Sequence, residues 1–212
     1  MTLRIESVAP KADRAGRFWV KFSDGTSLGL YRQTMEDHGL YAGMELTEER
    51  LGSLREAAGQ MSAKMRAVRI VSASAVSKRD LQERLVRKGE SEEQAAQAVA
   101  WMEDLNLLDD RQTAEQIVSR CVRSGYGKAR AKQALYEKKI PRELWEEALA
   151  DYPDQQDKIM EFLNSRLRGS WEQRDLKRAI DALVRRGHSY SEIQRCLRQM
   201  KLDEEDFRED IE

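Results

Sequence analysis

The residues of this sequence whose types and spacing best suit a chemical role are two groups of basic side chains. In one group, Arg174, Arg178 and Arg185 are four and seven positions apart, so on a helix they share one face. The other group shows similar spacing: Lys128, Lys132 and Lys139. Several cationic groups on one helix face attract the phosphates of a polyanion. The expected contact surface comprises Arg120, Arg123, Lys128, Lys132, Lys139, Arg174, Arg178, Arg185 and Arg186.

The sequence lacks the residue arrangements that a catalytic centre would need. Its two histidines, His38 and His188, are isolated, and each is typical of a helix end or turn rather than of a ligand. The stretch Gly125-Tyr126-Gly127-Lys128 is too short for a phosphate-binding loop and precedes no strand. Asp109 and Asp110 are typical of a helix start, where the helix dipole favours acidic groups. We therefore expect a protein that is not an enzyme and holds no cofactor or metal.

The near-neutral total charge conceals a segregation of charges along the chain. The 212 residues carry a formal net charge of −1, yet basic residues crowd 120–139 and 166–198 while the end from Asp203 is acidic. Such a chain can bind an anion locally despite its overall balance. The two cysteines, Cys121 and Cys196, form no Cys-x-x-Cys pair, and no apolar run reaches the roughly 20 residues of a membrane span. These features predict buried thiols, no membrane segment and a cytoplasmic location.

A repeat of about 50 residues positions both basic groups. Leu85, Leu135 and Leu183 are separated by 50 and 48 residues, and four places after each stands a turn residue: Gly89, Lys139 and Gly187. Helix-starting residues follow at Ser91, Pro141 and Ser189. A period in this range is typical of stacked helical repeats. We therefore expect a mostly α fold in which tandem three-helix repeats form an elongated array.

The N-terminal segment has a different period. Phe18, Val20 and Phe22 alternate with other residues, and Ser23-Asp24-Gly25-Thr26 is a hairpin signal. A two-residue turn would pair Phe22 with Ser27, whereas a longer loop would pair it with Leu28. The predicted organisation is a small β-hairpin domain with short helices at 1–60, followed by three repeats at 61–126, 127–169 and 170–212. Gly169-Ser170 separates the last two repeats. A short acidic segment from Asp203 takes the place of a final helix in the third repeat.

The order and spacing of four motifs resemble the RecX regulatory proteins of bacteria. The motifs are Ser77-Lys-Arg-Asp-Leu81 with Leu85-Val-Arg-Lys-Gly89, Leu105-Asn-Leu-Leu-Asp109-Asp110, Gly125-Tyr-Gly127-Lys128 and Leu183-Val-Arg-Arg-Gly187. The hairpin looks like the N-terminal extension of longer family members. The sequence departs from the family pattern at Lys138-Lys139, where Lys-Gly is usual, and at His188, where an aromatic residue is usual.

The resemblance implies a cytoplasmic, non-enzymatic protein that binds the RecA recombinase filament on single-stranded DNA. Such a protein modulates, and usually inhibits, the ATPase and strand exchange of the recombinase, and so regulates DNA repair, recombination and the SOS response. We expect it to act as a monomer. Two other functions are compatible with the helical pattern: a helix-turn-helix DNA-binding regulator and a protein-binding helical scaffold. The candidate recognition helices at 91–105 and 141–152 are acidic, which argues against the regulator.

Overall fold

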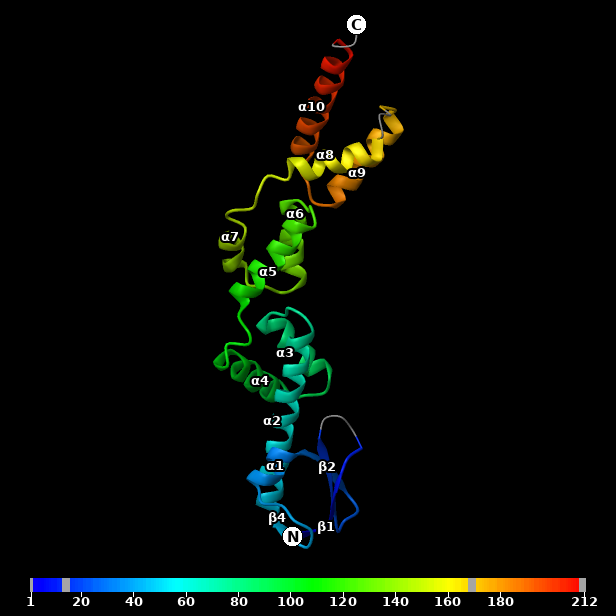
Figure 1. The fold of residues 1–212 in the computed structure, drawn as a ribbon. Coiled ribbons are helices and arrows are strands. Elements are labelled where there is room, and N and C mark those ends of the chain that lie inside the picture. Colours follow the sequence, from blue (N-terminus) through cyan, green and yellow to red (C-terminus); the bar gives the residue numbers. More distant parts are fainter. Residues whose placement is uncertain (1, 13–15, 168–170, 210–212) are drawn as a thin grey trace. The chain divides into compact units, whose positions relative to one another are not determined.

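The computed structural model describes the backbone of residues 2–12, 16–167 and 171–209, and side chains as far as residue 201. The chain forms two compact units, which are coloured in sequence order in Figure 1. Unit 1 comprises Met1–Ser74 and Lys78–Leu108, and unit 2 comprises Ala75–Ser77 and Asp109–Glu212.

Unit 1 begins with a four-stranded antiparallel sheet in the order β3-β2-β1-β4. The strands are β1 (Thr2–Pro10), β2 (Arg17–Phe22), β3 (Ser27–Tyr31) and β4 (Glu45–Thr47). Alternation along β2 buries Val20 and Phe22, and Ile5 of β1 lies opposite Phe22. Leu51 and Leu54 of the helix after β4 complete the same core. The predicted hairpin is confirmed by the pairing of β2 with β3, and it is part of a larger sheet.

The hairpin register differs from both expected alternatives. Lys21 pairs with Ser27, and the amide of Phe22 donates to the carbonyl of Thr26 at 2.9 Å, so Phe22 faces neither Ser27 nor Leu28. The reason is a three-residue connection in which Gly25 takes φ = 83° and its amide donates to the carbonyl of Phe22. A Gly in the left-handed region suits such a loop.

Four helices complete unit 1: α1 (Arg32–Asp37), α2 (Glu48–Ala73), α3 (Lys78–Arg87) and α4 (Glu92–Asp104). Thr47 caps α2, because its hydroxyl accepts a hydrogen bond from the amide of Arg50 at 3.3 Å. Ser91 and Gln94 form a capping box at the start of α4, as its sequence position predicts. Helix α2 contacts β3 and β4 as well as α3 and α4, and the predicted boundary between residues 60 and 61 falls inside this one continuous helix.

Unit 2 contains two helical cores. The first is built by α5 (Asp110–Arg123), α6 (Lys128–Glu137), the 3-10 turn η1 (Arg142–Leu144) and α7 (Trp145–Ala148). The second is built by α8 (Gln156–Leu167), α9 (Gln173–Arg185) and α10 (Tyr190–Glu209). Helix α5 therefore shares its core with α6 and α7, on both sides of the predicted boundary at residue 126.

The internal repeat is visible in burial and backbone conformation. Leu85, Leu135 and Leu183 are at most 1% exposed. The turn positions that follow them all take positive φ: Gly89 (93°), Lys139 (56°) and Gly187 (89°). A repeated pattern fixes the period of the helices but leaves open which three form one core, and the packing decides that.

The end of the chain differs from the prediction. Helix α10 continues to Glu209, so the acidic residues from Asp203 extend this helix rather than forming a separate short segment. The predicted separator at Gly169-Ser170 lies outside the described residues. Among the helices that the structure describes, none is both long enough and apolar enough to span a bilayer.

Candidate nucleic-acid interface

The first candidate surface is a groove between α6 and the η1–α7 segment, here called the Lys128 groove. Its volume is about 620 Å³, and its lining residues are Lys128, Lys132, Arg142, Trp145, Glu146, Leu149 and Ala150. Ala131 and Leu135 bury one face of α6 in the core, and Lys128 and Lys132, which flank that face on successive turns, are exposed. Two predicted contact residues therefore line one groove.

The Lys128 groove combines positive charge with a fixed aromatic ring. The indole Nε1 of Trp145 donates to the carbonyl of Ile140 at 3.0 Å, which holds this half-buried ring in place. The guanidinium of Arg142 lies 5.8 Å from the centre of the ring. Aromatic faces beside cations are the groups that bind bases and phosphates of a single strand.

The second candidate surface lies between α8 and α9 and is here called the Arg178 groove. Its volume is about 320 Å³, and its lining residues are Phe162, Arg166, Asp175, Arg178, Ala179, Ala182 and Arg185. Arg166 stacks over Phe162 at 5.5 Å from the ring centre, so this groove also pairs cations with an aromatic ring.

Acidic groups reduce the positive charge of the Arg178 groove. Arg178 Nη1 lies 3.9 Å from Asp175 Oδ1, and both side chains are substantially exposed. Asp181 falls between Arg178 and Arg185 at helical spacing, so the stripe seen in the sequence is not purely basic. Exposed ion pairs of this kind are weak, and a phosphate can compete for the guanidinium.

Two predicted contact residues do not lie on the expected basic helix faces. Lys139 follows the end of α6 with φ = 56°, so it leaves the helical line of Lys128 and Lys132. The guanidinium of Arg186 donates to the carbonyl of Ser124 at 2.9 Å and lies over the rings of Tyr126 and Phe162. Arg186 thus joins the two helical cores of unit 2.

The other predicted residues are exposed without lining either groove. Arg120 and Arg123 lie in the last turn of α5, and Arg174 lies in the first turn of α9. The sequence reasoning missed Arg142 and Arg166, which complete the two grooves. The only sequence feature that could have indicated Arg142 is its position directly after Pro141. For Arg166 the feature is its spacing of four from Phe162, which places both on one helix face.

Three groups inside unit 2, two thiols and one phenol, have raised pKa values. Burial raises the pKa of the thiols of Cys121 and Cys196, which keeps both below the thiolate fraction that a nucleophile needs. Burial also raises the pKa of Tyr152 to about 12, and its hydroxyl donates to the carbonyl of Tyr126 at 2.6 Å. These groups hold the helices together.

Comparison with known proteins places these helices in a family. Residues 109–149, which span α5 to α7, match the family domain described as "RecX, second three-helix domain". A protein of Cronobacter sakazakii named "Regulatory protein RecX" is 34% identical over 96 residues, which cover 41% of this chain and 58% of that protein. A protein of the same name from Clostridioides difficile is 29% identical over 164 residues, covering 76% of this chain and 73% of that one. Along most of its length the chain is therefore similar to RecX proteins.

The fold of the chain is also that of a solved RecX structure. "Crystal structure of regulatory protein RecX" matches with a TM-score of 0.62 at 19% identity, over 91% of this chain and 97% of the other. The RecX relatives bear the name of regulatory proteins. The matched RecX domain contains Lys128 and Lys132, while the Arg178 groove lies beyond it.

Proposed function

We propose that this protein binds the RecA recombinase filament on single-stranded DNA and lowers its ATPase and strand-exchange activities. Similarity to RecX proteins over most of the chain is the observation that carries this proposal. The protein acts without catalysis of its own, as a monomer in the cytoplasm, and contributes to the control of DNA repair and recombination.

The two grooves of unit 2 supply the chemistry that this role requires. The cations of the Lys128 groove and the Arg178 groove pair with phosphates of the strand or with acidic groups of the filament. Trp145 and Phe162 offer ring faces beside those cations. A protein that binds one state of the filament more tightly than another shifts the filament toward that state, which changes its ATPase rate.

The helix-turn-helix regulator is the weaker alternative because the chain lacks a suitable recognition helix in its second three-helix unit. Helix α7 has only four residues, Trp145–Ala148, and two of them are glutamates. Helix α4 is longer but begins with Glu92 and Glu93, which would repel the phosphates that flank a major groove. A purely protein-binding scaffold would bind its partner with little dependence on salt, and this separates it from the leading proposal.

The test is the single-strand-dependent ATPase rate of the cognate RecA, titrated with this protein at substoichiometric ratios. We expect the ATPase rate to fall already at ratios well below one molecule of this protein per recombinase subunit. The double variant Arg178→Glu/Arg185→Glu should lose this inhibition, while the control Lys177→Glu/Arg198→Glu changes the charge of the same unit at exposed positions outside both grooves and should retain it. An ATPase rate that the wild-type protein leaves unchanged would refute the proposed function.

A further inference from the structure

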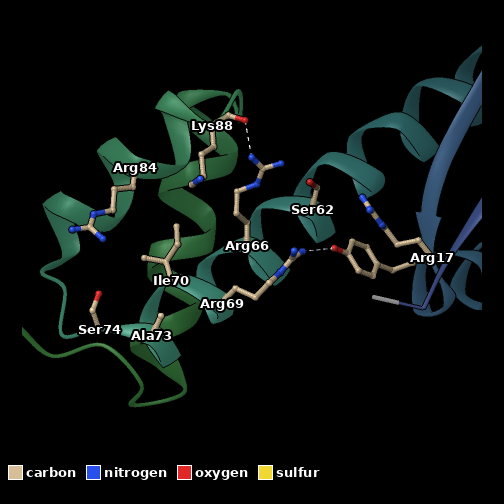
Figure 2. A pocket seen from close by; sticks show the side chains of 10 residues that line it. Arg17, Ser62, Arg66, Arg69, Ile70, Ala73, Ser74, Arg84 and Lys88 are labelled. Atoms are coloured by element: carbon tan, nitrogen blue, oxygen red, sulfur yellow. Dashed lines mark hydrogen bonds between the residues drawn. The ribbon is translucent and has the colours of Figure 1, made fainter. Parts of the chain in front are cut away.

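Unit 1 contains a third basic groove, which shares no lining residue with the two grooves of unit 2. It follows one face of α2 and is bounded by the sheet at one end and by α3 along its side (Figure 2). Its volume is about 510 Å³, and five of the ten residues that line it are cationic: Arg17, Arg66, Arg69, Arg84 and Lys88. We call it the Arg69 groove.

The arginines of the Arg69 groove are held by neighbouring groups. Arg66 Nη1 donates to the carbonyl of Lys88 at 2.7 Å, and Arg69 Nη2 donates to the hydroxyl of Tyr31 at 2.9 Å, as the dashed lines in Figure 2 mark. Arg69 Nε donates to the carbonyl of Met65 at 3.2 Å. Each guanidinium has five N–H donors, so these bonds orient the side chains and leave donors for a ligand.

Two cations of this groove pair with buried carboxylates. Arg66 pairs with Glu90 at 2.9 Å and Arg84 pairs with Asp80 at 2.8 Å, and both carboxylates are buried. Among the described residues, no carboxylate lines the groove itself. Arg69 donates to two neutral oxygens, the carbonyl of Met65 and the hydroxyl of Tyr31, which do not offset its charge, and Lys88 is exposed.

The length of the Arg69 groove indicates a polymeric ligand. Ser62, Arg66, Arg69, Ile70 and Ala73 line it at helical spacing along α2. At 1.5 Å rise per residue, the stretch from Ser62 to Ala73 spans about 17 Å, more than a single phosphate group needs. Ile70 and Ala73 provide only a small apolar area, which is poor for an acidic peptide that would rely on side-chain burial.

We propose that the Arg69 groove binds the sugar-phosphate backbone of a single nucleic-acid strand, as a contact additional to those of unit 2. Its guanidinium and ammonium groups pair with successive phosphates and read no sequence. The inference rests on the proposed function for the identity of its ligand. Binding of a strand by the Arg69 groove does not require the recombinase. An experiment can therefore contradict this inference without contradicting the proposed function, and the reverse.

The test is the fluorescence anisotropy of a labelled oligothymidine strand, titrated with the full-length chain at several chloride concentrations and without RecA. The variant Arg69→Glu/Lys88→Glu changes two exposed side chains of the groove. The control Arg50→Glu/Arg79→Glu makes the same charge change at exposed positions of unit 1 outside the groove. Circular dichroism of each variant checks that it is folded.

We expect the groove variant to bind the strand at least tenfold more weakly and the log-log salt slope to flatten by about 1.4, which is about 0.7 for each of two lost phosphate contacts. The control should keep the wild-type slope. An equal loss in both variants, or none in the groove variant, would overturn the proposal. So would saturable binding of inorganic phosphate alone, or displacement of the strand by polyglutamate at equal charge concentration. Loss of ATPase inhibition bears only on the proposed function.

Discussion

Gly127 and Gly187 lie backbone against backbone, and neither position has room for a side chain. A Cβ on Gly127 would be 2.0 Å from the carbonyl oxygen of Gly187, and one on Gly187 would be 2.3 Å from the amide nitrogen of Arg130. The amide of Gly127 donates to the carbonyl of Arg186 at 2.9 Å. The turn between α5 and α6 thereby docks on the turn between α9 and α10. This turn contact joins the two cores of unit 2.

Gly127→Ala should therefore separate the two turns. The methyl group meets backbone atoms, which cannot rotate away, so we expect a loss of about 3 kcal/mol in the free energy of unfolding of unit 2. Hydrogen exchange of the amides of Gly127 and Ala129, which donate across the turn contact, would report the loss. Gly52→Ala is the control, because this exposed helical position has no atom within 4 Å of a new Cβ and should gain about 0.5 to 1 kcal/mol.

The same turn contact should weaken in acid because of His188. Its ring is 4% exposed, and Nε2 lies 3.1 Å from the carbonyl of Gly125, an arrangement in which Nε2 carries the proton and donates it. Burial lowers the pKa of His188, against smaller raising effects from the bond to Gly125 and from Glu192. The unfolded chain therefore takes up a proton near pH 6.5 while the folded chain does not.

Stability from His188 should be fully present above about pH 6.5 and should decline as the pH falls below it. Thermal unfolding of the wild type and of His188→Gln over this range would measure the effect. The variant should show a flatter dependence of its midpoint on pH. If both proteins lose stability in parallel, the carboxylates elsewhere in the chain, and not His188, set the acid response.

The turn contact also separates the features of the fold that local sequence patterns could predict from those that they could not. Apolar spacing identified the buried leucines and the turn positions, because both depend on local periodicity. The docking of Gly127 on Gly187 joins residues 60 positions apart, so no local pattern reports it. For the same reason the pattern gave the period of the repeat and left the grouping of α5 with α6 and α7 to tertiary packing.

Short strands and grooves between elements were the other features that local patterns missed. Strand β4 has three residues and is held by pairing with β1, where Leu3 lies opposite Leu46. Arg142 and Arg166 join their grooves through the packing of one helical element on another. Helix periodicity placed Lys128, Lys132, Arg178 and Arg185 on outward faces, but it could not say which cations from other helices would meet them.

Lys139 offers a test of backbone strain at a repeat turn. It takes φ = 56°, where Gly89 and Gly187 stand at the equivalent positions. Because an L-residue pays about 1 kcal/mol in the left-handed region, Lys139→Gly should raise the free energy of unfolding by up to about that amount. Gly89→Ala, which meets no atom within 4 Å, should cost a similar amount through strain alone. Chemical denaturation measures both, and a destabilised Lys139→Gly would mean that the lysine side chain contributes more than the strain costs.

Two adjacent arginines should separate strand binding from stability. Arg185 is exposed and lines the Arg178 groove, whereas Arg186 is half-buried, bonds to Ser124 and stacks on Tyr126 and Phe162. Arg185→Ala should leave thermal stability within about 0.5 kcal/mol and should flatten the salt slope of strand binding by about 0.7. Arg186→Ala should lose about 1 to 3 kcal/mol of stability, because a charge-assisted bond and two ring contacts disappear.

Thermal unfolding and strand anisotropy, measured in parallel on both variants, give the comparison. The sequence alone treats the two arginines as equivalent members of one basic surface, so an equal effect of both substitutions on the salt slope would restore that simpler prediction. A fall in stability for Arg185→Ala together with unchanged stability for Arg186→Ala would contradict the assigned roles. The ring contacts of Arg186 make its structural role specific to a planar guanidinium, so Arg186→Lys should recover only part of the lost stability.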